Sequence, residues 1–338
     1  MARTATGATV LTHADGRVTM TPLADGRRRV AIETEVPFAW PRPRVWQTRY
    51  PPDLVEDLMN VKGPRWVIDE IRRDEDPLYV ENDFRHDIFG FVAPGDLAGR
   101  TVLDFGCGSG ASSAVLTRLA PGCRITGIEL RPELVAAAEK RAAFLGLDAR
   151  YLVSPSAESL PPDLGTFDYI LFSAVVEHLL PQERTSLLPL VWERLAPGGI
   201  LFLNQTPHRW FPVEGHTTGL PLLNYLPAAL AWRYARACSR YGHRDETWTG
   251  MLRSGIRGST EGEVVAILSR DGGRAVSLTP SRDGIASHLD LWRSAAASRR
   301  GRASLSLKYA ALKAVRALTG ATLVPNITLA LRKGSNDA

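Results

Sequence analysis

The sequence predicts an α/β protein built on a doubly wound, mostly parallel sheet of seven strands. Short apolar runs alternate with helical runs from Thr101 to Gln205, a pattern typical of parallel sheets that helices cover on both faces. A glycine-rich loop lies between the first strand and the first helix of this pattern, at 106–110. Acidic residues, Asp104 and Glu129, come near the ends of the first two strands. Together these features favour a ligand-binding sheet edge.

Each element follows from local pattern. The seven expected strands are 101–105, 124–130, 149–154, 167–174, 200–205, 274–280 and 323–333. The expected helices are 111–119, 132–146 and 183–199, a helix from 263 to 270, and helical structure within 284–320. Pro132 suits a first helical turn and Gly146 a helix end. Thr260 and Glu263 match a capping box. These elements place one domain at 86–333.

Two stretches fall outside the alternation. Residues 1–85 are expected to form an N-terminal arm with cap helices. Within 1–46, Asp15-Gly16 and Asp25-Gly26 separate β-prone runs, as hairpin turns do. Apolar residues recur at helical spacing from Pro51 to Arg73. Residues 206–258 are rich in aromatic residues, proline and glycine, and we expect them to form a lid inserted after the fifth strand.

Composition excludes several classes of protein. The 338 residues are 44% hydrophobic and 23% charged, as in ordinary globular domains. The net charge of +5 comes from scattered arginines rather than a basic stripe, which gives no strong nucleic-acid signal. Three cysteines without a CxxC motif exclude a disulfide framework and favour a reducing compartment. We find neither a signal peptide nor 18 consecutive apolar residues, so a cytoplasmic location is expected.

The loop that follows Asp104 reads FGCGSG. Its glycines allow a tight turn and close approach of the backbone to a ligand. With Ala111 the segment also satisfies a loose dinucleotide fingerprint. However, the Asp104 carboxylate would repel a pyrophosphate and suits a cationic group. Glu129, 23 residues after Gly106, is placed to accept hydrogen bonds from ribose hydroxyls.

The stretch 101–205 resembles the class I S-adenosylmethionine-dependent methyltransferases, in particular those of quinone biosynthesis and polysaccharide gene clusters. The matching motifs, in the family's order, are VLDFGCGSG (102–110), GIEL (127–130), SAESLP (156–161), FDYILFSAVVEHL (167–179) and LAPGGILFL (195–203). The resemblance implies a Rossmann-like methyltransferase fold and S-adenosyl-L-methionine as cofactor. The cofactor-binding residues that it implies are Asp104, Gly106, Gly108 and Gly110 at the methionine end, Glu129 and Leu130 at the ribose, Ser156, Ala157 and Glu158 at the adenine, and Ser173 after the fourth strand.

Methyl transfer from a sulfonium is an in-line displacement, so the protein mainly supplies alignment and desolvation. A hydroxyl acceptor also needs a base, or a metal that lowers its pKa. Glu177 and His178 follow the fourth strand and His216 follows the fifth, and all three should lie at the carboxyl edge of the sheet. We therefore expect these three residues to be catalytic, although His178 could simply cap a helix and His216 could be a structural loop residue.

The remaining candidates lie in or near 206–258. The expected substrate-binding residues are His208, Arg209, Trp210, Glu214 and Tyr225. Glu177, His178, Glu214 and His216 could also hold a divalent metal, as an ExxEH cluster does in some quinone-precursor and RNA-end methyltransferases. Ala174 stands where the first glutamate of that cluster would be, which makes a metal the less favoured alternative.

The segment 207–227 resembles one in methyltransferases of polysaccharide and natural-product gene clusters. The expected activity is methyl transfer to a hydroxyl of a sugar, a glycan or another small natural product. One alternative is C- or O-methylation of a quinone or phenolic ring. Less favoured alternatives are a nucleic-acid methyltransferase, an NAD-dependent oxidoreductase and a catalytically silent binding subunit.

Overall fold

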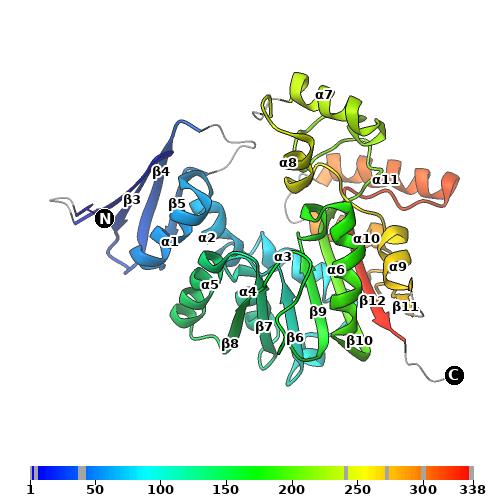
Figure 1. The fold of residues 1–338 in the computed structure, drawn as a ribbon, viewed down its shortest axis with the longest axis horizontal. Helices are drawn as coiled ribbons and strands as arrows, with labels where there is room; N and C mark the ends of the chain where they lie inside the picture. The colour runs from blue at the N-terminus through cyan, green and yellow to red at the C-terminus, as the bar shows by residue number, and fades with distance from the viewer. Residues whose placement is uncertain are drawn as a thin grey trace.

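The computed structural model describes residues 2–3, 7–36, 43–239, 243–270, 274–297 and 302–334. Two sheets organise the described chain (Figure 1). A sheet of seven strands forms the body of the protein, and a smaller sheet of five strands lies beside it, next to α1 and α2.

The large sheet has the strand order β8-β7-β6-β9-β10-β12-β11. The strands are β6 (Thr101–Phe105), β7 (Arg124–Glu129), β8 (Ala149–Val153), β9 (Phe167–Ser173), β10 (Leu195–Pro207), β11 (Ala275–Ser277) and β12 (Asn326–Lys333). Only β12 runs against its neighbours among these described strands, while the pairings from β8 to β10 are parallel. The structure therefore confirms the expected seven-stranded, mostly parallel sheet.

Helices cover both faces of this sheet. One face packs against α6 (Pro181–Glu193) and α9 (Glu261–Leu268), through residues such as Leu187 and Val264. The other face packs against α3 (Val80–Asp87) and α4 (Ala111–Leu119), through residues such as Phe84 and Val115. The remaining helices of this body are η2 (Pro94–Leu97), α5 (Pro132–Leu145), η3 (Val176–His178), α10 (His288–Ala297) and α11 (Arg302–Thr319). No helix in the described ranges is both long and apolar enough to cross a bilayer.

The fifth strand begins earlier than the expected range of 200–205. Helix α6 ends at Glu193, and Pro197, Gly198 and Gly199 belong to β10 rather than to a helix end. The pairing register with β9 shifts between Leu195 and Ile200, so a bulge absorbs these three residues. Proline and glycine are tolerated at such bulges, where ladder hydrogen bonds are interrupted.

The small sheet is an antiparallel meander. Its strands are β1 (Ala2–Arg3), β2 (Thr9–His13), β3 (Gly16–Pro22), β4 (Arg28–Thr34) and β5 (Val45–Thr48). The two expected Asp-Gly turns join β2 to β3 and β3 to β4. One face of the meander packs on α1 (Pro52–Lys62), η1 (Pro64–Trp66) and α2 (Val67–Glu75) through a closed apolar core. The division of the chain at 85/86 stays a prediction.

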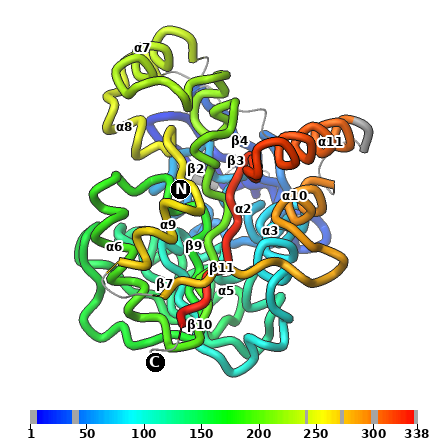
Figure 2. The backbone as a smooth tube through the Cα atoms, turned by 90° about the vertical axis from the view of Figure 1, so that its right-hand side faces the viewer, coloured from blue at the N-terminus to red at the C-terminus, as the bar shows by residue number. Residues whose placement is uncertain are grey.

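The first two residues of the 206–258 segment still belong to β10, and the chain leaves the large sheet after Pro207. The rest of the segment builds η4 (Leu223–Tyr225), α7 (Ala228–Cys238) and α8 (Trp248–Arg253). Figures 1 and 2 show α7 and α8 together beyond one end of the large sheet. Leu223, Ala231 and Met251 form a small core there, against which Trp232 and Trp248 pack. Three of the segment's aromatic residues, Trp232, Tyr234 and Trp248, therefore contribute to its own packing. The role of the segment as a lid stays a prediction.

A buried arginine joins the two sheets. Arg141, on α5, is fully buried and donates to the Ser109 hydroxyl (3.0 Å) and to the Glu70 carbonyl on α2 (3.0 Å). The Ser109 hydroxyl in turn donates to the Glu70 carboxylate at 2.5 Å. Burial opposes the charge of Arg141, but Tyr50, Asp74 and Glu70 outweigh it and raise the pKa of Arg141. The guanidinium therefore stays charged and ties α2 to the glycine loop.

Replacing Arg141 by Met should lower the free energy of unfolding by about 3 kcal/mol, because acidic groups would stay buried without their cation. Urea denaturation followed by circular dichroism measures this change. Arg150→Met, at an exposed position on β8, is the matched control and should shift stability by less than about 0.5 kcal/mol. Equal shifts in the two variants would contradict the structural role of Arg141.

Candidate active site

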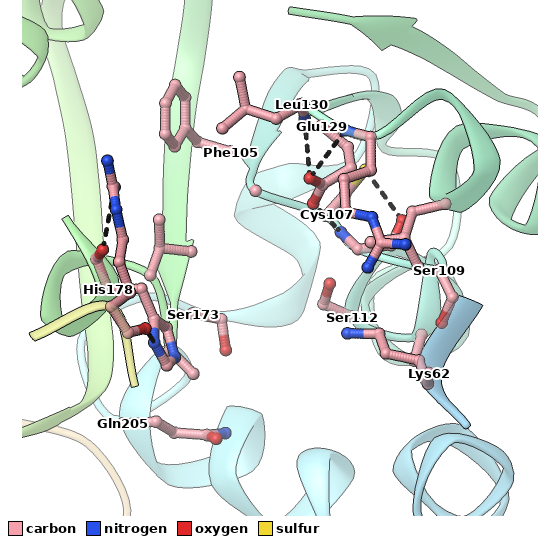
Figure 3. A pocket seen from close by; sticks show the side chains of 18 of the residues that line it. Lys62, Phe105, Cys107, Ser109, Ser112, Glu129, Leu130, Ser173, His178 and Gln205 are labelled. Carbon is pink, nitrogen blue, oxygen red and sulfur yellow. Dashed lines mark hydrogen bonds between the residues drawn. The ribbon is translucent and has the colours of Figure 1, made fainter. Parts of the chain in front are cut away.

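A cavity of about 880 Å³ lies where the carboxyl ends of β6, β7, β8, β9 and β10 meet the N-terminal helices and the 206–258 segment. Figure 3 shows residues from these different elements facing one space. Its volume is within the range of small-molecule and cofactor pockets. Ligands of open parallel sheets bind at this edge, so the cavity is the candidate active site.

The glycine loop forms one wall of the cavity. Gly106, Gly108 and Gly110 have φ angles of +69°, +56° and +79°, which side chains disfavour. A Cβ at Gly106 would lie 2.8 Å from Val175, and one at Gly110 would lie 3.0 Å from Ala138. Gly106 and Gly108 border the cavity, whereas Gly110 packs against α5 and does not. Two of the three expected glycines therefore reach the ligand space.

Asp104 does not border the cavity, and its expected contact with the methionine end stays a prediction. Its side chain is 1% exposed and accepts hydrogen bonds from the Ser112 (2.6 Å) and Ser113 (2.7 Å) hydroxyls. Burial raises the pKa of Asp104, and these hydroxyls partly offset that rise. Successive strand side chains point to opposite faces, so Phe105 borders the cavity while Asp104 anchors the start of α4.

Glu129 borders the cavity at the end of β7, beside Leu130. One of its carboxylate oxygens accepts from the Leu130 amide at 2.7 Å, and the other accepts from the Gly108 amide at 3.1 Å (Figure 3). The carboxylate thus also holds the glycine loop in place. Ionised oxygens accept several hydrogen bonds at once, so Glu129 retains capacity for ligand hydroxyls.

The loop after β8 supplies Ser156 and Ala157 to the cavity, whereas Glu158 does not border it. The Ser156 hydroxyl accepts from the Glu158 amide (3.2 Å) and lies 2.7 Å from the Ser159 hydroxyl. Ser173, at the end of β9, borders the cavity on the other side of the glycine loop.

Glu177, His178 and His216 come together, as the sequence analysis expected of their strands. Glu177 is fully buried; one carboxylate oxygen accepts from Thr206 (2.8 Å), and the other, Oε1, has no hydrogen-bond partner among the described residues. That Oε1 lies 3.8 Å from Nε2 of His178. The His178 and His216 rings meet edge to face, with centroids 5.5 Å apart.

This trio could also hold a metal ion. The ligand atoms of Glu177, His178 and His216 all lie within 4.8 Å of one another, and imidazole with carboxylate is a donor set that zinc and similar ions accept. Glu214 does not join them. Its buried carboxylate accepts from the amides of His216, Thr217 and Thr218, so it shapes the loop that carries His216.

His216 is poised as a neutral imidazole. Burial lowers its pKa from the usual histidine value, and the nearby Glu177 carboxylate only partly counters this effect. Gly255, which sequence analysis missed, holds the ring in place. A Cβ there would lie 2.6 Å from Cδ2 of His216 and 3.2 Å from Cγ of Glu177, and the φ of Gly255 is +87°. The residue therefore has to be glycine for the histidine to keep its position.

The five expected substrate-binding residues lie away from this cavity. Arg209 and Trp210 border a second, smaller cavity. Nδ1 of His208 accepts from the Trp210 amide (3.1 Å). The Tyr225 hydroxyl donates to the Trp210 carbonyl (2.7 Å), and Glu214 serves its own loop. Side-chain direction in a long irregular segment cannot be read from spacing, and the substrate-binding role of these five residues stays a prediction.

The large cavity is also bordered by residues that the sequence did not point to. The N-terminal helices supply Lys62, Trp66, Glu70 and Arg73, and the later chain supplies Gln205, Arg253 and Asn326. In Figure 3, Lys62 and Gln205 lie on different sides of the same space. No local motif marks these positions, because they depend on how distant segments pack.

Comparison with known proteins gives a partial match. Residues 102–199 match a family model described as a methyltransferase domain. The ubiquinone biosynthesis O-methyltransferase of Xanthomonas oryzae pv. oryzae (strain PXO99A) is 35% identical over 134 residues, which are 39% of this chain and 54% of the relative. That of Xanthomonas euvesicatoria pv. vesicatoria (strain 85-10) is 36% identical over 115 residues, 33% of this chain and 46% of the relative. The chain thus spans about half the length of these curated relatives.

Solved structures show more distant likeness. Mitomycin 7-O-methyltransferase is 16% identical, with a TM-score of 0.45 over 82% of this chain and 59% of that one. Human N-acetylserotonin methyltransferase in complex with its cofactor is 16% identical, with a TM-score of 0.44 over 85% of this chain and 61% of that one.

Glu129→Gln should weaken binding of S-adenosylmethionine by about tenfold, because hydrogen bonds to a charged acceptor exceed those to a neutral amide. Isothermal titration calorimetry measures the dissociation constant. Glu133→Gln is the matched control, since Glu133 lies in the next turn and is 63% exposed. Unchanged affinity in Glu129→Gln would remove Glu129 from the cofactor site.

Proposed function

We propose that this chain, a class I S-adenosylmethionine-dependent methyltransferase by its core motifs and its matched domain, transfers a methyl group to a hydroxyl of a small acceptor. The observation that carries the proposal is the continuity of one cavity. The same space is bordered by the glycine loop and Glu129 at one end and by His178 and His216 at the other. The bound cofactor and the histidine that takes the proton would therefore both face the molecule that accepts the methyl group.

The cofactor would lie across the glycine loop. Backbone at Gly106 and Gly108 allows close approach, and Glu129 would accept the ribose hydroxyls. The adenine would lie toward Ser156 and Ala157. In this placement the sulfonium faces Ser173 and the part of the cavity that His178, Gln205 and His216 border.

The transfer itself needs alignment and one proton acceptor. The acceptor oxygen forms a bond to the methyl carbon as the carbon–sulfur bond breaks, and the electron pair stays on sulfur as a thioether. The hydroxyl proton passes to the imidazole of His216, which burial keeps neutral. The imidazolium that results would face the unpartnered Glu177 carboxylate oxygen, which stabilises the positive charge.

His178 would position this pair rather than take the proton. Its Nδ1 lies 2.7 Å from the Arg253 carbonyl, which requires a proton on Nδ1 and leaves Nε2 toward Glu177. The same three side chains would instead activate the hydroxyl if they held a divalent cation. We favour the histidine base, because Glu214 and Ala174 add no further ligand to the trio.

For the acceptor, we favour a sugar, a glycan or another hydroxyl-bearing natural product. Polar side chains, including Gln205, Thr217, Arg253 and Asn326, border the cavity on the histidine side, and such groups suit an acceptor with several hydroxyls. The second candidate is a phenolic ring of a quinone precursor, which the names of the curated relatives favour. Methyl transfer from labelled cofactor to matched glycoside and catechol acceptors, with NMR of the product, separates the two.

His216→Ala should lower kcat at least about 100-fold while the dissociation constant of S-adenosylmethionine stays within about twofold, because a general base acts on the acceptor alone. Single-turnover assays and calorimetry measure both quantities. His13→Ala, which alters a histidine on β2 of the small sheet that does not border the cavity, is the control. Turnover at the parental level in His216→Ala would remove this residue from the mechanism.

The two alternatives, a histidine base and a bound divalent metal, predict different effects of a metal chelator on activity. With a histidine base, dialysis against EDTA should leave kcat unchanged. A loss of activity that zinc, manganese or magnesium restores would instead assign Glu177, His178 and His216 to a metal site. Failure of the protein to bind S-adenosylmethionine at all would overturn the proposed function.

The rate should also report the low pKa of His216. The base works only when neutral, so kcat should fall as the pH drops through a value below the ordinary histidine pKa of about 6.5 and level off above it. A pH profile of kcat between pH 5 and 8 tests this sign. An activity that rises as the pH falls would contradict the assignment.

A further inference from the structure

We propose that a second cavity, formed between the 206–258 segment and α6 and α9, binds the oxyanion group of a ligand, a phosphate or a carboxylate. The cavity has a volume of about 560 Å³. The residues that carry the argument, all bordering it, are Arg184, Arg209, Trp210, Trp248, Arg257 and Glu263. Nothing in the proposed methyl transfer uses this space.

Two arginines in the cavity lack an acidic partner. Arg209 and Arg257 both donate to the carbonyl of Asn224, and Arg257 also donates to the Leu226 carbonyl at 2.6 Å. Neither forms an ion pair with a carboxylate within the described ranges. Burial lowers the pKa of both, and that of Arg257, also lowered by Arg209, falls to about 10. Glu263 acts on Arg209 and Glu214 acts on Arg257 from beyond ion-pair distance, and burial outweighs both. Two half-buried like charges thus lie together without a carboxylate in direct contact in the described part of the chain.

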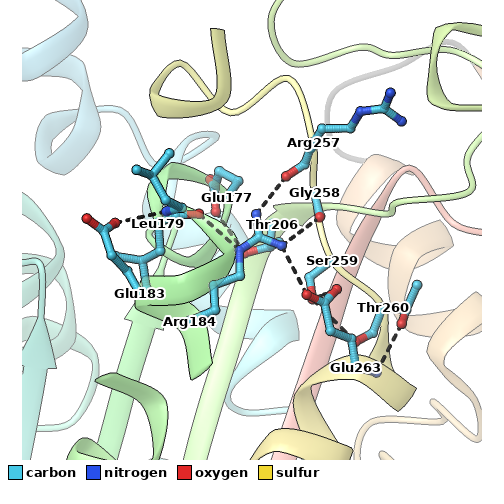
Figure 4. A network of polar contacts seen from close by, with 11 residues as sticks. Glu177, Leu179, Glu183, Arg184, Thr206, Arg257, Gly258, Ser259, Thr260 and Glu263 are labelled. Atoms are coloured by element: carbon cyan, nitrogen blue, oxygen red, sulfur yellow. Dashed lines mark hydrogen bonds and ion pairs between the residues drawn. The ribbon is translucent and has the colours of Figure 1, made fainter. Parts of the chain in front are cut away.

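The third arginine that borders this cavity, Arg184, does have an acidic partner. Arg184 is buried and donates to the carbonyls of Leu179, Arg257 and Gly258, and it pairs with Glu263 at 3.3 Å (Figure 4). Its charge and hydrogen bonds are satisfied within the protein. Glu263, the one acidic residue among the described residues that border this cavity, is therefore already paired, and the guanidiniums of Arg209 and Arg257 remain available to an anion.

Aromatic rings pack against both Arg209 and Arg257. The guanidinium of Arg209 lies 4.2 Å from the centroid of the Trp210 ring, and that of Arg257 lies 5.3 Å from the Trp248 ring. Cation–π contact of this kind orients a guanidinium without using its N–H donors. The guanidinium N–H groups of Arg209 and Arg257 that do not bind carbonyls can donate to an oxyanion. The two indole rings provide flat surfaces for the rest of the ligand.

The site is separate from the large cavity but shares a wall with it. Arg253 and Ser254 border the large cavity, whereas Arg257 and Gly258 border the small one. Gly255, which contacts His216, lies between them. An anionic ligand would therefore bind on the other side of residues 253–258, the segment that supports His216. The ligand would be either the far end of a long methyl acceptor or a separate molecule.

Calorimetric titration of the full chain with phenyl phosphate, benzoate and inorganic phosphate tests the site, with phenol as the neutral probe. Phenyl phosphate or benzoate should bind and phenol should not. Arg209→Gln and Arg257→Gln should each weaken binding by at least about tenfold. Arg233→Gln, which alters an exposed arginine on α7, is the matched control and should leave the affinity unchanged.

Comparison of the probes separates the sources of the oxyanion: equal binding of inorganic phosphate points to a free anion, and tighter binding of the aromatic probes to an anion carried on a larger molecule. Retained binding of S-adenosylmethionine shows that each variant folds, and this measurement is independent of anion binding. No binding of any anion to the parental protein, or binding that both glutamine variants retain, would overturn the proposal.

Discussion

The candidate active site depends on one buried hydrogen-bonded contact, that of the Arg141 guanidinium with the Ser109 hydroxyl and the Glu70 carbonyl. Arg141 comes from α5 of the large sheet, Ser109 from the glycine loop and Glu70 from the helix that packs on the small sheet. Two of the three guanidinium nitrogens of Arg141 donate hydrogen bonds, while its Nε has no partner among the described residues. The nearby Tyr50, Asp74 and Glu70 offset the cost of burying its charge. The contact therefore fixes the glycine loop and the N-terminal helices in one arrangement, and these two parts form adjoining walls of the cavity.

The other wall depends on a second buried charge. Glu177 is fully buried, and among the described residues its carboxyl group accepts one hydrogen bond, so its other oxygen is left to act on the His216 ring. Burial and this carboxylate act on His216 in opposite directions, and burial prevails. The imidazole is therefore neutral before the proposed reaction, and the Glu177 carboxyl group, already in place, would offset part of the cost of charging it.

Elements with a strong local pattern could be predicted from the sequence, and contacts across long separations could not. The Pro132 start and Gly146 end of α5 depend on backbone preferences within a few residues, and both were confirmed. The end of β6 was also correct, yet Asp104 faces α4 rather than the cavity. The sequence pattern therefore predicts where a strand ends, but it does not predict which residue a buried side chain contacts. Lys62 and Arg73 reach the cavity only through tertiary packing, which no spacing reports.

The position of β12 has a consequence for the order of folding. Strands β6 to β10 pair through short parallel crossovers, whereas β12 inserts antiparallel between β10 and β11 after more than a hundred further residues. During synthesis, the apolar edge of β10, with Leu201 and Leu203, would wait unpaired until Asn326–Lys333 emerges. An open edge of this kind favours aggregation. Truncation before β12 should therefore harm solubility more than its eight residues alone would suggest.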